Sequence, residues 1–418
     1  MKRTTTVGWR AYGALVRVLS AVHYGVLSPL SASDEGGWQW LRRRLTAVPP
    51  PAAAGRRVWI HAVSAGESKV AELLRRHLLA EAPELSVVLS ATTYSGFARV
   101  SRIAGEAASF VMPLDTLAAQ RSLFATLRPD LLVLVESEFW PAQFAAAAEA
   151  GVPVVVVNAT MSERSFARHR RFPLVARRTL LQARRILAQD EPTLQRYLAL
   201  GVPAERLAIS GNLKLAPTGA VTAPRVDAAP TVVFGNIHEA ELAALAPAVQ
   251  TLRRQRPEVR LVLVPRYPGK LSAATLTAAF GTELVRVTDA AEAVAGPLVW
   301  VDRMGALAGL YATATAGVVC GTFAPIGGHD LAEPLHMGAA SLYGPHVERQ
   351  RALDVALQAI GCARQVRNAD DLVATLGEVL DRREDREAMV GRFRALSEEA
   401  GVRLAEIAGD LVRLLPPQ

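Results

Sequence analysis

The sequence predicts an α/β protein built from two Rossmann-like domains, with an N-terminal helix that associates with a membrane. Its 418 residues are too many for a single domain with one ordinary hydrophobic core and suit two domains of about 150 to 200 residues each. Short apolar runs alternate with helical segments from Val58 onward; the alternation stops near Gly211 and resumes at Thr231. Half of the residues are apolar, which is enough to form two hydrophobic cores.

Each expected strand is a short run rich in β-branched residues, and most end at a glycine or a polar residue. The run Leu131–Val135 is apolar at every position, which is typical of parallel strands buried on both faces. In the first half we expect strands at 58–61, 86–91, 131–136, 154–158, 186–188 and 207–210. In the second half we expect them at 231–235, 260–265, 298–301, 317–320 and 340–342.

The same alternation on both sides of one interruption predicts two similar domains that face each other across a cleft. Ligands of open α/β sheets bind at the carboxyl ends of the strands, so the cleft is the expected site. The segment 215–230 is rich in Ala, Pro, Thr and Val and reads as a linker. The expected divisions are an N-terminal helix at 1–33, a first domain at 34–214, the linker at 215–230, a second domain at 231–400 and a C-terminal helix at 401–418.

The first 33 residues carry basic side chains and no acidic one around an apolar stretch, residues 11–30. Arg17 and His23 interrupt this stretch, which favours a helix lying at a membrane interface over one that spans the bilayer. Two alternatives stand beside this interpretation. Residues 31–33 resemble a signal-peptide cleavage site, although Arg17 argues against a signal peptide, and the helix could simply pack on the first domain.

Composition points to a reducing compartment and to anionic partners. Cys320 and Cys362 are the only cysteines, too few for a disulfide framework or a four-cysteine zinc site. The formal net charge is +8, which suits nucleic acid, anionic lipid or a phosphorylated substrate. Eight arginines lie close together with one acidic neighbour, Glu163, at positions 164, 168, 170, 171, 177, 178, 184 and 185.

This arginine-rich stretch has no recognised nucleic-acid-binding motif and no interleaved aromatics. Phosphorylated lipid headgroups match its charge equally well. A solvated helix face is the structural alternative. We therefore expect a membrane surface and an anionic glycolipid as partners rather than nucleic acid.

In the first half, two strand ends carry carboxylates. Glu67 lies between a strand and a helix, where it could take a proton from an incoming hydroxyl or merely favour the positive helix start. Glu136 and Glu138 follow the next buried strand beside Trp140, which suggests a polar pocket with an aromatic wall, although helix initiation before Pro141 explains them too. Lys214, beside the expected linker, offers a positive charge to a developing anion.

In the second half, the glycine-rich segment 327–334 (GGHDLAEP) is the strongest single motif. Its glycines allow close backbone approach, and we expect a short helix that begins near Asp330 and binds phosphate. Glu333, one turn into that helix, could accept hydrogen bonds from both ribose hydroxyls. A glycine-rich turn capped by Asp330 is the alternative. Arg266, at the end of an expected strand, could also bind phosphate.

Several separated motifs in one order resemble those of the 3-deoxy-D-manno-octulosonic acid (Kdo) transferases, which are glycosyltransferases of the two-Rossmann GT-B architecture. The resemblance covers about residues 58 to 351. Its motifs are 61–67 (HAVSAGE), 136–141 (ESEFWP), 158–165 (NATMSERS), 211–214 (GNLK), 238–239 (HE), 265–266 (PR), 304–305 (MG), 327–334 (GGHDLAEP) and 344–346 (GPH).

The resemblance implies a role for each matched residue. Glu67 would be the general base, and Glu136 and Lys214 would support the transition state. The nucleotide site would comprise Pro265, Arg266, Met304, Gly305, Ala306, Gly328, His329, Asp330, Leu331, Ala332 and Glu333. The acceptor site would comprise Ser64, Gly66, Glu138 and Arg164.

The resemblance further implies an enzyme that transfers Kdo from CMP-Kdo to a lipid A precursor (lipid IVA) in lipopolysaccharide core biosynthesis. It implies inversion at the anomeric carbon, no metal or other cofactor, and an active site on the cytoplasmic side of the inner membrane. Two alternatives are a GT-B enzyme that uses a UDP-sugar, either a transferase or an epimerase, and a non-catalytic protein that binds anionic glycolipid.

Three departures from the family pattern fall in the donor half. Asp330 replaces the usual Asn and brings a negative charge near a phosphate. Ala306 replaces a Glu after the Met-Gly pair, and residues 236–237 (Asn-Ile) replace a Ser-Thr pair. The departures bear on donor recognition rather than on the fold.

Overall fold

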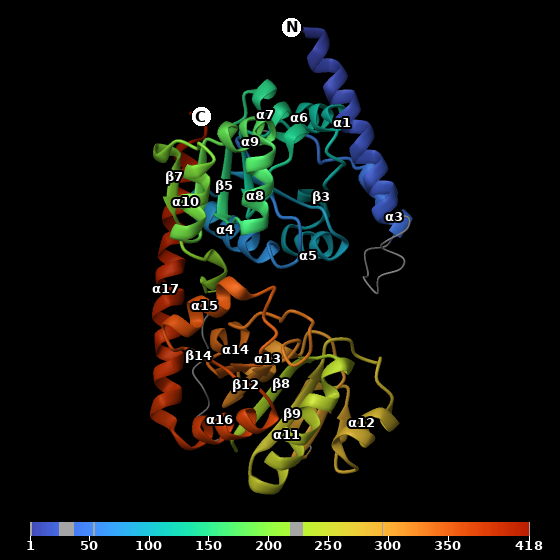
Figure 1. Cartoon of the computed structure of the whole chain (residues 1–418), viewed down its shortest axis with the longest axis vertical. Helices are drawn as coiled ribbons and strands as arrows, with labels where there is room; N and C mark the ends of the chain where they lie inside the picture. The colour runs from blue at the N-terminus through green and yellow to red at the C-terminus, as the bar shows by residue number, and fades with distance from the viewer. Residues whose placement is uncertain (1, 25–36, 53–54, 218–228, 295, 418) are drawn as a thin grey trace. The chain divides into compact units, whose positions relative to one another are not determined.

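The computed structural model describes residues 2–24, 37–52, 55–217, 229–294 and 296–417. The chain forms two compact units, Met1–Ala216 with Ala400–Gln418, and Pro217–Glu399 (Figure 1). The long helix α17 (Arg383–Arg413) contributes its first part to the second unit and its last part to the first. The expected signal-peptide cleavage site and most of the expected linker lie outside the described residues.

The first unit contains a seven-stranded sheet in the order β3-β2-β1-β4-β5-β6-β7, with every neighbouring pair parallel. The strands are β1 (Arg57–His61), β2 (Ser86–Ala91), β3 (Ser109–Val111), β4 (Leu131–Val135), β5 (Val154–Ala159), β6 (Arg185–Ala188) and β7 (Leu207–Ile209). The helices are α1 (Lys2–Val22), α3 (Gly37–Leu45), α4 (Ser68–Glu81), α5 (Tyr94–Ala104), α6 (Leu117–Leu127), α7 (Pro141–Ala150), α8 (Glu163–Arg171), α9 (Pro173–Arg178) and α10 (Glu191–Ala199), with short 3-10 turns at 106–108, 180–182, 204–206 and 213–215.

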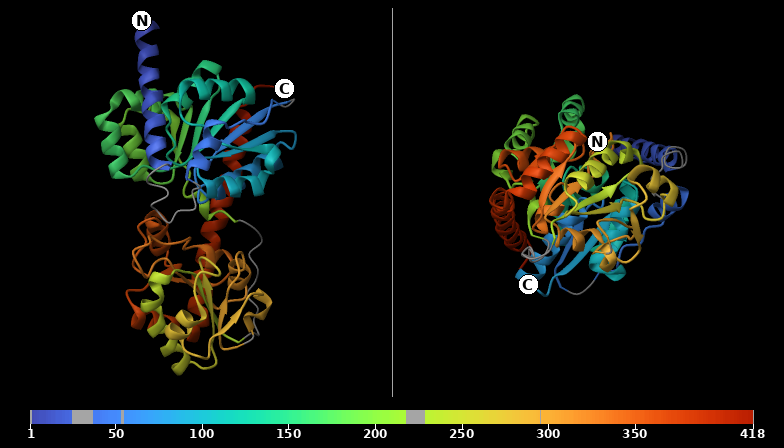
Figure 2. Two further views of the ribbon diagram at one scale, coloured as in Figure 1. Left: turned by 90° about the vertical axis from the view of Figure 1, so that its right-hand side faces the viewer. Right: turned by 90° about the horizontal axis from the view of Figure 1, so that it is seen from below.

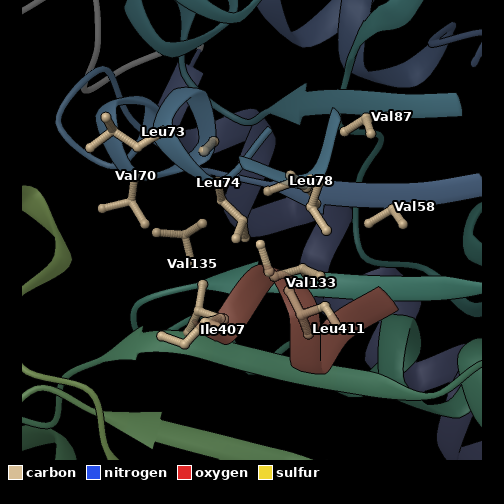
Figure 3. Close-up of a cluster of buried hydrophobic side chains, with 14 of the residues drawn as sticks. Val58, Val70, Leu73, Leu74, Leu78, Val87, Val133, Val135, Ile407 and Leu411 are labelled. Atoms are coloured by element: carbon tan, nitrogen blue, oxygen red, sulfur yellow. The ribbon is translucent and has the colours of Figure 1, made fainter. Parts of the chain in front are cut away.

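This sheet is buried on both faces because alternate residues of each strand enter different cores. Val58 and Ile60 of β1 pack with α4 and the end of α17, where Ile407 and Leu411 meet Val133 and Val135 (Figure 3). Trp59 points the other way, into a core shared with α6, α7 and α9. The two-sided burial explains the uninterrupted apolar runs in the sequence.

The second unit repeats this plan with a parallel sheet in the order β10-β11-β9-β8-β12-β13-β14. The strands are β8 (Thr231–Ile237), β9 (Arg260–Pro265), β10 (Val285–Val287), β11 (Leu298–Val301), β12 (Ala316–Val319), β13 (Ala340–Tyr343) and β14 (Ala363–Gln365). The helices, besides α17, are α11 (Leu242–Gln255), α12 (Ala273–Phe280), α13 (Leu307–Tyr311), α14 (Glu333–His336), α15 (Arg351–Ala359) and α16 (Ala369–Asp381), with 3-10 turns at 239–241 and 290–294.

Helices cover both faces of this sheet as well (Figure 2). Val232 and Phe234 of β8 enter one core with α11 and α16, whereas Val233 enters the other with α13. The α/β prediction, with two parallel Rossmann-like sheets, is therefore confirmed. The boundaries predicted for the five segments remain predictions.

Helix α1 packs on the first unit through Val16 and Ala21 and forms a partly buried hydrogen bond with it. Tyr12 Oη donates to Asp115 Oδ2 over 2.6 Å. The same carboxylate accepts the backbone N–H groups of Ala142 and Gln143 at the start of α7, over 3.1 and 2.9 Å. Within the described residues, no helix combines the length and the hydropathy that crossing a bilayer requires.

Candidate functional site

Glu67 is held by the turn that connects β1 to α4. Its Oε2 accepts the backbone N–H of Val63 over 2.6 Å, and its Oε1 accepts the Ser64 hydroxyl over 3.1 Å. It provides no side-chain cap to α4, whose first residue is Ser68. The carboxyl group thus has an orientation set by the turn, while Glu67 also occupies the N-cap position of α4, where its charge favours the helix start.

Glu136 forms an ion pair with Lys214. Lys214 Nζ lies 2.5 Å from Glu136 Oε1, and both side chains are largely buried. Asn158, at the end of β5, links the two residues, because its Nδ2 donates to Glu136 Oε1 over 3.4 Å and its Oδ1 accepts the N–H of Leu213 over 2.9 Å. Glu136 and Asn158 both have left-handed backbone, at φ 66° and 53°. Such backbone is uncommon outside glycine and often marks functional sites.

Glu138 accepts a hydrogen bond from the indole N–H of Trp140. Burial raises the pKa of Glu138, and the charge of Arg44 opposes that rise. Arg44 is fixed in turn, since its Nε donates to the carbonyl of Met112 over 3.0 Å and its Nη1 to Tyr24 Oη over 3.2 Å. Arg44 comes from α3, far from the site in sequence, and no motif pointed to it.

Three carboxylates therefore share one small region with two cations. Burial and then the charges of Glu136 and Glu138 raise the pKa of Glu67 to about 8. Burial raises the pKa of Glu138 to about 7. Groups with such shifted pKa values suit proton transfer near neutral pH. We call Glu67, Glu136, Glu138 and Lys214 the carboxylate site.

The carboxylate site lies at the switch point of the first sheet. Glu67 follows β1 and Glu136 follows β4, and these neighbouring strands are where the strand order changes direction. Ligands of doubly wound sheets bind outside the carboxyl ends of the strands at this point. The structure thus brings together the three residues predicted to be catalytic.

The residues expected to bind the acceptor are less uniformly placed. Glu138 belongs to the carboxylate site, and Ser64 donates its hydroxyl to Glu67 of that site. Gly66 is exposed beside Glu67. Arg164 is exposed in the first turn of α8. Within the arginine-rich stretch, Arg185 pairs with Asp410 over 3.3 Å, so its charge is already partly neutralised.

In the second unit, two imidazole rings meet at the switch point of the second sheet. His238 follows β8, and His329 lies in the connection after the neighbouring strand β12. Their Nε2 atoms are 2.8 Å apart, the ring planes are within 12° of parallel, and the ring centroids are 5.1 Å apart. Burial lowers the pKa of both rings, and the charges of Arg266 and Arg349 lower it further. The pKa of His329 falls to about 3.

The glycine-rich segment is a tight turn around these rings. Gly327 and Gly328 have φ of 104° and 89°. A Cβ on Gly327 would lie 2.7 Å from Arg349 Cγ, and a Cβ on Gly321 would lie 2.6 Å from His329 Cδ2. Glycine at positions 321 and 327 therefore lets the cationic and imidazole side chains lie against the backbone.

The predicted helix start near Asp330 is wrong. Helix α14 begins at Glu333 and has four residues, so Glu333 is its first residue and not one turn inside it. Asp330 Oδ1 accepts the N–H of Ala332 over 3.1 Å, which forms a turn before the helix. The turn alternative describes this segment better, and a helix this short adds little dipole.

Other residues predicted to bind the nucleotide differ in accessibility. Pro265 ends β9, and Arg266 donates its backbone N–H to the carbonyl of Ile237 over 2.9 Å. Met304 is 64% exposed, and Gly305 and Ala306 lead from it into α13. Leu331 and Ala332 are buried as whole residues, so neither their side chains nor their backbone atoms reach the surface.

Sequence reasoning missed Arg349 and Glu241 in this region. Glu241 is fully buried, and its carboxylate accepts the backbone N–H of His238 over 3.0 Å and of Phe323 over 2.9 Å. It thereby ties the turn after β8 to the one after β12. Among the described residues, no three His, Cys, Asp or Glu side chains gather in a way that could hold a metal ion.

Comparisons with known proteins find relatives along most of the chain. Residues 39–216 match the family model described as 3-deoxy-D-manno-octulosonic-acid transferase (kdotransferase). A 3-deoxy-D-manno-octulosonic acid transferase from Bordetella pertussis is 31% identical over 389 residues, 88% of this chain and 87% of that protein. One from Chlamydophila psittaci is 27% identical over 384 residues, again 88% and 87%.

Solved structures share the fold at low sequence identity. A UDP-GlcNAc 2-epimerase from Neisseria meningitidis bound to UDP-GlcNAc is 12% identical, with a TM-score of 0.58 over 85% of this chain and 100% of that one. The glycotransferase of kitacinnamycin is 18% identical, with a TM-score of 0.55 over 88% and 100%.

Proposed function

Because the chain belongs to the 3-deoxy-D-manno-octulosonic acid (Kdo) transferase family, we propose that it is an inverting glycosyltransferase that moves Kdo from CMP-Kdo to a lipid A precursor. The observation that carries this proposal is the carboxylate site. It places a hydrogen-bonded carboxyl group with a pKa of about 8 at the switch point of the first sheet. A general base that deprotonates a sugar hydroxyl needs such a group.

In this reaction Glu67 takes the proton of an acceptor hydroxyl. The hydroxyl oxygen then forms a bond to the anomeric carbon of Kdo as the bond from that carbon to the CMP phosphate breaks. The Val63 and Ser64 hydrogen bonds fix the orientation of Glu67. Lys214, oriented by Glu136, stabilises the negative charge that develops in the transition state.

We assign the donor to the second unit and the acceptor to the first. Arg266 and Arg349, beside the glycine turn, supply positive charge for the donor phosphate. Glu333 would accept hydrogen bonds from the ribose hydroxyls. Transfer requires the bound donor to reach Glu67 during the reaction.

The donor assignment predicts a preference for cytidine over uridine nucleotides. Calorimetric titration of the full chain should show CMP binding at least ten times more tightly than UMP and UDP, because the site must distinguish an amino group from a carbonyl on the base. Tighter binding of UDP would contradict the Kdo assignment and favour a UDP-sugar enzyme of the same architecture.

The raised pKa of Glu67 predicts a rising pH profile for transfer. Only the ionised carboxylate accepts a proton, and with a pKa of about 8 roughly a tenth of the free enzyme is ionised at pH 7. We therefore expect kcat/KM for the acceptor, measured at saturating CMP-Kdo, to rise about tenfold per pH unit below 8 and to level off above it. A profile that is flat between pH 6 and 8 would show that Glu67 is not the base.

We also propose that α1 lies on an anionic membrane surface. Leu15, Val18, Leu19 and Val22 are between 46% and 60% exposed and share one face of the helix, at the spacing i, i+3, i+4, i+7. Arg10 and Arg17 are exposed on the same helix. Exposed apolar and basic residues on one helix are typical of interfacial binding.

The membrane proposal predicts that Val18→Glu weakens binding to phosphatidylglycerol vesicles several-fold in a sedimentation assay. The matched control is Val48→Glu, which adds the same charge at a valine that is 79% exposed outside α1. Equal loss in both variants would count against the apolar face of α1 as the contact, and equal binding of wild type to purely zwitterionic vesicles would count against an anionic surface as the partner.

A further inference from the structure

The imidazole pair formed by His238 and His329 has a place in the fold that the proposed reaction does not yet use. The two rings follow β8 and β12, neighbouring strands at the switch point of the second sheet. Both side chains are partly exposed, so a ligand can reach them. Neither ring contributes to a hydrophobic core.

The 2.8 Å contact between the two Nε2 atoms fixes how protons are shared. One ring must donate an N–H and the other must accept it, so the two rings cannot both carry a proton on Nε2. In the uncharged pair, the donating ring keeps a free lone pair on its Nδ1, and the accepting ring carries its own proton on Nδ1. One further proton, on that free Nδ1, gives a cation with both Nδ1 atoms as donors and leaves the Nε2 contact intact.

The surroundings decide when this further proton binds. The facing cations are Arg266 and Arg349, and Lys270 Nζ lies 4.4 Å from the ring centroid of Tyr267, which packs edge-on against His238. The carboxylates of this region are Glu241, Asp330 and Glu333. Glu241 is occupied by backbone N–H groups, and Asp330 Oδ1 accepts the N–H of Ala332.

Burial is the main reason that a charged ring is unfavourable, and the charges of Arg266 and Arg349 add to it, so the free pair is uncharged at neutral pH. An anion bound between the arginines would cancel their effect. The anion would also attract a proton to the pair directly, because a charged imidazole pair offers its Nδ1–H groups as charge-assisted hydrogen-bond donors.

We propose that the His238–His329 pair is part of the anion site for the donor and that it takes up a proton from solvent when a phosphate binds. This inference rests on the proposed function, because it assigns the phosphate to a cytidine nucleotide. It adds His238 to the residues that contact the donor. It also makes donor binding depend on pH in the direction opposite to the Glu67 step, since phosphate binding weakens as pH rises.

The test is calorimetric titration of the full chain with CMP at pH 7 in two buffers of different ionisation enthalpy, which gives the number of protons taken up. We expect His238→Gln to take up fewer protons than wild type and to bind CMP about tenfold more weakly. Cytidine, which lacks the phosphate, should bind both proteins equally. His77→Gln, a half-buried histidine on α4, should behave as wild type.

The outcomes separate this inference from the donor assignment. If wild type binds CMP and His238→Gln shows the same proton uptake and affinity, the inference is wrong and the donor assignment stands. If wild type does not bind CMP at millimolar concentration, both are wrong. Should His238→Gln fail to fold, His329→Gln tests the same proposal, with the same measurements of proton uptake and CMP affinity.

Discussion

Glu67→Gln is expected to lower the rate of Kdo transfer about 10²- to 10⁴-fold while CMP binding stays within about twofold of wild type. The amide keeps the size of the side chain; its oxygen can accept the Val63 N–H, and its NH2 group can donate to the Ser64 hydroxyl, which the carboxylate instead accepts from. It cannot take a proton from the acceptor hydroxyl. Transfer is measured under single-turnover conditions, and CMP binding by calorimetry.

The matched control for this variant is Glu72→Gln on α4, the helix that follows Glu67. Glu72 pairs with Arg99 over 3.1 Å at the surface, and the loss of such a pair costs about 1 kcal/mol or less. Its transfer rate should equal that of wild type. Unchanged transfer in Glu67→Gln would exclude Glu67 as the base and would favour a binding protein or another catalytic group.

Glu67→Gln should also change how stability depends on pH. The folded-state pKa of Glu67 is raised from 4.5 to about 8, so the folded protein binds a proton that the unfolded chain has released. Wild-type stability should therefore fall as pH rises through this window, and the variant should lose this part of the fall. Urea unfolding at pH 5 and pH 8.5 measures the difference.

Lys214→Met should lower transfer about 10²- to 10³-fold, which is the usual loss when one charge-stabilising group is removed from an active site. The variant also leaves the Glu136 carboxylate without its partner at 2.5 Å. Since the Glu136 charge raises the pKa of Glu67, we expect the rise of kcat/KM to move to higher pH. The pH profile of the variant measures both effects.

A double variant separates the two roles of Lys214. Glu136→Gln with Lys214→Met removes both charges, so transfer should stay slow while the rise of kcat/KM moves back to lower pH. If Lys214→Met alone leaves both the rate and the profile unchanged, Lys214 supports neither the transition state nor the carboxylate site.

The interior strands were predictable from sequence, and most of the edge strands were not. Buried strands such as β4 are apolar at every position because helices cover both faces. The strands β3, β10 and β14 were missed. Each has three residues and lies at an edge of its sheet. An edge strand has only one neighbouring strand, so fewer of its side chains need to be apolar. Their short runs do not differ from those of loops.

The candidate site was predictable where its residues end a strand. Glu67, Glu136 and His329 all follow strands within recognisable motifs. Arg44 and Arg349 carry no such pattern, because they reach the site through the packing of separate elements and their role depends on distances in space. The start of α14 was misplaced because an aspartate at a turn and one at a helix start look alike in sequence.

Two departures from the family pattern have a structural explanation. Asn236 has left-handed backbone at φ 63°, which asparagine tolerates better than most residues. Asp330 uses its Oδ1 to close the turn to Ala332, a bond that an asparagine in the same place could also accept. Nothing in the structure explains Ala306.

The central claim is that this chain transfers Kdo from CMP-Kdo to a lipid A precursor. The most direct measurement is incubation of the full chain with both substrates, followed by mass spectrometry of the lipid. Our account predicts a mass increase of one or more whole Kdo residues that requires CMP-Kdo and is absent with Glu67→Gln. A lipid of unchanged mass in the presence of folded wild-type protein that binds CMP would contradict it.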